Sequence, residues 1–138
     1  MNKLLQQKIP LWTPSVESPT PERLTWLKAI LDGDQKAIHL ELVKCARDPY
    51  YWLINWVLTE NSASSSTNPF EKFPDKQHLY YVTRIWERER FLIVPKSRQI
   101  MMTWLMVALY LHDAMFKPSR LTFIQAQKEN AADAALER

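Results

Sequence analysis

Glycine is almost missing from this chain. Only Gly33 occurs among its 138 residues, whereas average usage is roughly 7%. Because glycine takes left-handed backbone conformations most easily, the tight turns must use Asn, Asp, Ser and Pro, and a phosphate loop closed by several glycines is excluded.

Cysteine is equally scarce. The single Cys45 has no second cysteine to pair with, which excludes an internal disulfide and suits a reducing compartment.

Long hydrophobic runs are missing as well. The longest apolar stretch, residues 104–111, is far shorter than the roughly 20 residues that cross a bilayer. The N-terminal sequence from Lys3 to Lys8 lacks the apolar region of a signal peptide. We therefore expect a cytoplasmic protein that makes no contact with a membrane.

Aromatic residues are plentiful and the charge is mildly basic. Six tryptophans are many for this length, and most of them are expected in a core or an interface. The net charge of +3 and the pI near 9.0 permit contact with nucleic acid or a nucleotide without arguing for it. The hydrophobic content of 46% is that of an ordinary soluble protein, long enough for one modest domain.

The chain divides into four regions. Residues 1–20 hold three prolines and predict an extended arm, and residues 21–60 predict a helical segment. Residues 61–69 form a Ser-rich linker, and residues 70–138 form the remainder. Helix starts with a capping side chain are expected at Thr20, Asp48 and Asp75, and a further helix is expected from about Asp34, after a break at Gly33-Asp34.

Two helical patterns indicate which faces are buried. Ile38, Leu42 and Cys45 recur at helical spacing and indicate a buried stripe on the second helix. Arg84 and Arg88 alternate with acidic residues near the end of a later helix. That alternation is typical of a solvated helix face rather than of a DNA-binding stripe.

Residues 91–124 predict a strand, a helix and a second strand. Phe91–Val94 is a short apolar run, the helix over residues 100–116 is apolar almost all round, and Leu121–Ile124 is again strand-like. Such a crossover gives a parallel pair. We therefore expect an α/β fold, in which a helical N-terminal segment precedes the first βαβ part of a parallel sheet like that of P-loop NTPases. Two parallel strands make no stable sheet, so that sheet is expected to be incomplete, and a last helix from Lys128 reaches the chain end without a stop signal.

The polar loop between the first strand and the helix is suited to phosphate. Lys96 and Arg98 supply positive charge, the following helix start supplies a dipole, and Thr103 supplies a hydroxyl for Mg²⁺. Aligned on the pattern G-x-x-x-x-G-K-[ST], only Thr103 matches. On this pattern alone, an incidental turn between strand and helix is the favoured interpretation.

An ordered series of motifs resembles the large terminase subunits of tailed phages, which are ATP-driven DNA-packaging motors. Lys96-Ser97-Arg98-Gln99 followed by Thr103 is similar to the family's deviant Walker A, K-S-R-Q-x-G-x-[ST]. The resemblance covers roughly residues 45–138, so residues 70–138 would be a partial P-loop ATPase domain. It is also carried by three further segments: Asp48–Trp52, Phe70–Gln77 and Phe123–Glu129.

The resemblance implies a role for each matching residue. Lys96 would contact the β- and γ-phosphates of ATP, with Arg98 as a second cation and Ser97 and Gln99 completing the nucleotide-binding loop. Thr103 would ligate Mg²⁺, and Gln77 would hydrogen-bond the adenine edge. Met101 stands where the family keeps glycine, and a left-handed conformation there costs a bulky residue roughly 1–2 kcal/mol.

The resemblance also implies a setting. The full-length family member is an ATPase and nuclease of the bacterial host's cytoplasm, oligomeric on viral double-stranded DNA and assembled with a portal protein and a small terminase subunit. This chain shows no Walker B strand ending in Asp-Glu and no nuclease residues. We therefore expect a truncated product that is inactive alone and carries no catalytic residue. The alternative is a non-enzymatic helical interaction module, or a degraded prophage product, without nucleotide binding.

Overall fold

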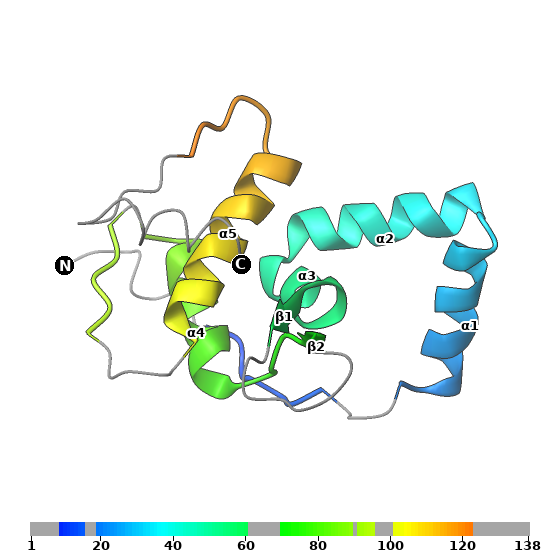
Figure 1. Cartoon of the computed structure of the whole chain (residues 1–138), viewed down its shortest axis with the longest axis horizontal. Helices are drawn as coiled ribbons and strands as arrows, with labels where there is room; N and C mark the ends of the chain where they lie inside the picture. Colours follow the sequence, from blue (N-terminus) through cyan, green and yellow to red (C-terminus); the bar gives the residue numbers. More distant parts are fainter. Residues whose placement is uncertain (1–8, 16–18, 61–69, 90, 96–100, 123–138) are drawn as a thin grey trace.

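The protein is mostly helical. Its computed structural model describes residues 9–15, 19–60, 70–89, 91–95 and 101–122, and Figure 1 draws the others in grey. The helices are α1 (Pro21–Leu31), α2 (Gln35–Arg47), α3 (Pro49–Trp56), α4 (Gln77–Trp86) and α5 (Met102–Phe116), and the strands are β1 (Leu58–Glu60) and β2 (Phe70–Lys72). None of these helices is long and apolar enough to cross a membrane.

Three helix starts lie where the sequence predicts them. The Thr20 side chain accepts a hydrogen bond from the backbone N–H of Arg23, and the Asp34 and Asp48 carboxylates cap α2 and α3 in the same way. Gly33 makes the turn between α1 and α2 with φ +84°, a conformation that favours glycine. The prediction at Asp75 is displaced, because α4 begins at Gln77 without a side-chain cap.

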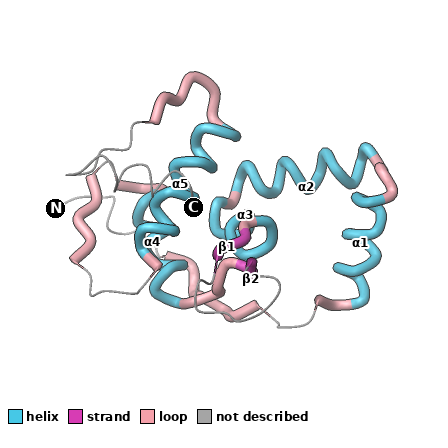
Figure 2. Tube along the Cα trace, viewed as in Figure 1, coloured by secondary structure: helices cyan, strands magenta, loops and turns pink. Residues whose placement is uncertain are grey.

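The helical pair α1–α2 extends from the body of the molecule, with α1 at its outer edge (Figures 1 and 2). After α3 the chain forms an antiparallel hairpin in which Thr59 pairs with Glu71. One further bond, from the backbone N–H of Phe73 to the carbonyl of Val57 at 3.0 Å, extends this pairing by one residue. The hairpin thereby carries the chain from the end of α3 toward α4.

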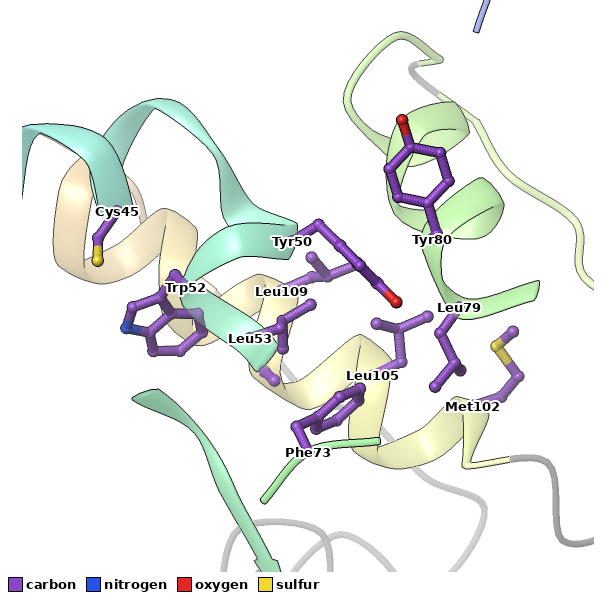
Figure 3. Packing of buried hydrophobic residues seen from close by; sticks show 11 residues of the cluster. Cys45, Tyr50, Trp52, Leu53, Phe73, Leu79, Tyr80, Met102, Leu105 and Leu109 are labelled. Carbon is purple, nitrogen blue, oxygen red and sulfur yellow. The ribbon is translucent and has the colours of Figure 1, made fainter. Parts of the chain in front are cut away.

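The core lies where α3, α4 and α5 converge. Leu53, Leu79, Leu105 and Leu109 have no exposed surface, and Phe73 from the loop before α4 closes the cluster (Figure 3). Each fully buried leucine contributes roughly 1.5–3 kcal/mol relative to an exposed one. Side chains from both sides of the Ser-rich linker thus share one core.

The predicted α/β fold is wrong. The only sheet in the described part of the chain is the two-stranded antiparallel hairpin, and no parallel pair occurs there. The predicted strand Phe91–Val94 is irregular, with Phe91 84% and Ile93 92% exposed. Leu121 and Thr122 are not in a strand either. The remainder of that second strand, the linker and the helix expected from Lys128 lie outside the described residues.

The physical reason lies in what covers α5. An apolar run of four residues does not distinguish a buried strand from a loop, and a parallel strand needs neighbours that bond it and cover both its faces. Here α3 and α4 cover the buried side of α5. Phe91–Val94 is not a strand, and the two-stranded sheet of the described residues does not include it.

Candidate functional site

The N-terminus of α5 is the first element of the candidate site. Met101 precedes the helix in a left-handed conformation, φ 57° and ψ 16°, and its carbonyl accepts from the backbone N–H of Leu105 at 3.0 Å. The Met101 side chain makes no capping hydrogen bond. The N–H groups of a first helical turn have no partner within the helix, and together with the helix dipole they favour an anion.

Thr103 is exposed on this first turn, while its neighbours anchor the turn in the core. Met102 is 5% exposed and Leu105 is fully buried. The buried side chains of Met102 and Leu105 hold this end of α5 against the core and leave the Thr103 side chain at the surface. The predicted loop residues Lys96, Ser97, Arg98 and Gln99 lie outside the described residues.

Gln77 lies at the same end of the core as Thr103. It is the first residue of α4 and is exposed. The first turns of α4 and α5 lie at the same end of the core, where Leu79 and Met102 belong to the shared cluster (Figure 3). The two predicted site residues that the structure describes are thus both exposed, each in the first turn of its helix.

A buried carboxylate, Glu41 on α2, organises the α1–α2–α3 region. Its Oε1 accepts from the Tyr51 hydroxyl at 2.7 Å, from Trp56 Nε1 at 2.9 Å and from Arg23 at 2.9 Å. Its Oε2 accepts from Trp26 Nε1 at 2.8 Å and from Arg23 at 3.2 Å. Burial opposes ionisation, but these donors outweigh it and lower the pKa of Glu41 to about 2. A charged carboxylate therefore joins three helices.

A second carboxylate, Asp75, joins the N-terminal segment to the body. It accepts from Trp12 Nε1 at 3.0 Å, from the Tyr50 hydroxyl at 2.5 Å and from the backbone N–H of Ser15. Burial disfavours its charge, yet the bonds from Tyr50, Trp12 and Ser15 hold the pKa of Asp75 below its usual value. A residue near the start of α4 thus anchors a segment that lies 60 positions earlier in the chain.

Arg84 on α4 is tied to α3 rather than solvated. Its guanidinium donates to both oxygens of Asp48 at 3.0 Å and to Glu87 at 2.8 Å, and it lies over the Tyr80 ring at 5.0 Å. Burial lowers the pKa of Arg84, but the bonds to Asp48 and Glu87 raise it above its ordinary value. The sequence predicted a solvated face here, and for Arg84 that prediction is wrong, since its side chain is 17% exposed.

Sequence reasoning missed the role of Glu41 and gave Asp75 a different one. Asp75 was predicted to cap a helix, and its bonds to the N-terminal segment were not predicted. Glu41 left a fainter signal, because it shares helical spacing with Ala37 and Cys45, both of which are buried. Within the described residues, no cluster of three His, Cys, Asp or Glu side chains could hold a metal ion.

Comparisons of this chain with protein-family models, with curated proteins and with solved structures found no match.

Proposed function

We propose that the chain supplies the ATP-binding phosphate loop of a motor of the phage terminase class, which packages viral DNA into procapsids. The observation that carries the proposal is the left-handed backbone of Met101. A non-glycine residue rarely takes this conformation. In the resembled family, glycine stands at this position between the loop and the helix. The junction therefore has the backbone conformation that the motif requires even though its glycine is replaced.

The roles follow from the chemistry of each group. Lys96 and Arg98, which precede α5 in the sequence, supply positive charge for phosphate oxygens, which a helix N-terminus favours, and Ser97 and Gln99 complete the loop. Thr103, exposed on the first turn of α5, ligates Mg²⁺ through its hydroxyl.

Gln77 contacts the adenine from the neighbouring helix end. The proposed site consists of a loop and two helix ends, and the residues that the structure describes add no parallel sheet to it. In the assembled motor the partners are viral double-stranded DNA, a portal protein and a small terminase subunit. Hydrolysis is not assigned to this chain.

Thermal unfolding with Mg-ATP tests the proposal. A ligand that binds only the folded state stabilises it by about 2.7 kcal/mol at a hundredfold excess over the dissociation constant. For a chain of this length that is a rise in Tm on the order of 8 °C. We expect Lys96→Ala to abolish most of this rise, because the phosphate loses its principal cation.

The matched control is Lys36→Ala, which removes an exposed lysine at the start of α2 and should leave the rise unchanged. An equal rise in the Lys96 variant would remove Lys96 from the site. No rise at millimolar Mg-ATP in the unaltered chain would reject nucleotide binding and favour the alternative, a helical interaction module.

A further inference from the structure

The N-terminal arm, residues 9–15, is bound to the body in the manner of a peptide ligand. It has no helix or strand and shares no backbone–backbone hydrogen bond with the rest of the described chain. It runs beside α4, where Figure 1 shows it in blue. Two of its side chains, Ile9 and Trp12, pack against the core cluster. The arm is therefore attached through a few side chains.

A groove with aromatic walls receives the arm. We call it the arm groove, and define it by Asp48, Tyr50, Tyr51 and Ile54 at the start of and along α3, and Tyr80 and Arg84 on α4. Tyr50 meets Tyr80 edge to face, with ring centroids 5.1 Å apart, so rings from two helices fix its shape. A hollow of about 190 Å³ remains between these residues and Leu11, Trp12 and Thr13 of the arm. The arm thus forms one wall of an open hollow beside these rings.

One carboxylate anchors the arm in this groove. Asp75 accepts from the indole Nε1–H of Trp12 and from the backbone N–H of Ser15, and the Tyr50 hydroxyl donates to the same carboxylate. An aromatic anchor with a polar tip, placed in a pocket with a fixed acceptor, is how extended peptides are commonly recognised. Pro10 and Pro14 flank the anchor and favour the extended backbone that the groove accepts.

We propose that the arm groove is a peptide-docking site and that a second copy of this chain can fill it, so that two copies exchange arms. The structure identifies the occupant, because the sequence seated in the groove is the chain's own. All contacts made within one copy are available between two. The chain's own arm competes for the arm groove with an effective concentration in the millimolar range. The arm of a second copy therefore fills the groove mainly when the chain's own arm is prevented from binding there. This inference is independent of nucleotide binding.

A complementation experiment between two full-length variants tests the proposal. Trp12→Ala leaves the groove intact but removes the anchor of the arm, whereas Asp75→Ala leaves the arm intact but removes its acceptor. We expect each variant alone to be monomeric, and an equimolar mixture at about 0.2 mM to show a heterodimer by light scattering after gel filtration. A mixture that stays monomeric, with both variants as helical as the unaltered chain by circular dichroism, overturns the proposal.

A peptide titration covers the case in which either variant does not fold. Trp12→Phe keeps an aromatic ring but removes the indole N–H that Asp75 accepts, together with part of the ring area. A fluorescein-labelled peptide of residues 9–15 should bind this full-length variant at least tenfold more tightly than the unaltered chain, measured by anisotropy. The same peptide with alanine replacing the tryptophan should bind at least tenfold more weakly. Equal binding of the two peptides would show that the arm groove does not recognise the tryptophan side chain and would overturn the proposal.

Discussion

Replacing Glu41 by glutamine should destabilise the protein by roughly 3 kcal/mol. The Oε1 atom can still accept from Tyr51, Trp56 and one nitrogen of Arg23, but an NH₂ group now replaces Oε2 and faces the donors of Trp26 and Arg23. Each donor left unpaired in a buried site costs about 1–3 kcal/mol, and more when it is charged. The Glu41 side chain is only 6% exposed, so water cannot restore these bonds.

The lowered pKa of Glu41 agrees in size with this cost. The same hydrogen bonds lower the pKa from 4.5 to about 2, and each pKa unit corresponds to about 1.4 kcal/mol, which gives a contribution on the order of 3 kcal/mol. A carboxylate with a lowered pKa stabilises the folded state above its unfolded pKa, and this contribution is lost as the pH falls toward its folded pKa. The contribution should therefore be complete at pH 6 and disappear between about pH 4.5 and pH 2.

Urea unfolding at pH 7 and pH 2.5 measures both effects. At pH 7 the Glu41→Gln variant should unfold at a lower urea concentration with an unchanged m-value, and at pH 2.5 the difference from the unaltered chain should shrink to less than 1 kcal/mol. Glu60→Gln is the control, since Glu60 is exposed on β1 and should change stability by less than about 0.5 kcal/mol. A penalty below 1 kcal/mol at pH 7, or one independent of pH, would refute the reasoning.

Two further substitutions test the junction before α5 and the core. Met101→Gly should raise the free energy of unfolding by about 1 kcal/mol, because glycine removes the left-handed strain at some cost in unfolded-state entropy. Met115→Gly, at an exposed position of the same helix, should instead lower it by about 1 kcal/mol. Leu105→Ala should lower it by about 2–5 kcal/mol, whereas Leu111→Ala, 51% exposed in the parent chain, should cost less than 1 kcal/mol. Urea titrations check all four variants. A stabilising Met115→Gly would contradict the argument from left-handed strain at Met101, and a neutral Leu105→Ala would contradict the argument from burial.

Local chemistry made part of the fold predictable. A helix start depends on a side-chain oxygen and on N–H groups two or three positions later, so Thr20 and Asp48 could be recognised as caps from the sequence. Both caps occur as predicted, and Asp34, predicted only as the approximate start of a helix, caps α2. The same reasoning failed at Asp75, because its carboxylate is engaged by Tyr50 and Trp12, the latter 63 positions away. A residue of a capping type that bonds a distant side chain has the same kind of sequence neighbours as a true cap, so the sequence does not separate the two.

Polar burial was the part that periodicity could not predict. The pattern indicated a buried stripe of Ile38, Leu42 and Cys45, but the buried residues of α2 are Ala37, Glu41 and Cys45, with Leu42 52% exposed. The stripe is rotated because Glu41 has donors on α1 and α3. A buried carboxylate is stable only when such donors surround it, and no apolar pattern reports where they lie.

The predicted parallel sheet does not occur in the described residues, so another cause holds Met101 in its left-handed conformation. Burial of Met102 and Leu105 contributes roughly 1.5–3 kcal/mol each, which exceeds the roughly 1–2 kcal/mol cost of the conformation. Packing alone can therefore impose it. A phosphate loop would add a second cause, because a bound nucleotide requires the same backbone.

The two causes differ in the Met101→Gly variant. If packing alone decides, the gain in stability should be the same with and without Mg-ATP. If the junction also serves the phosphate site, a glycine that removes the side chain beside it should tighten Mg-ATP binding, and the gain should grow with nucleotide concentration. Thermal unfolding of the two chains across a nucleotide titration separates these outcomes, since only the second makes the difference in Tm depend on ligand.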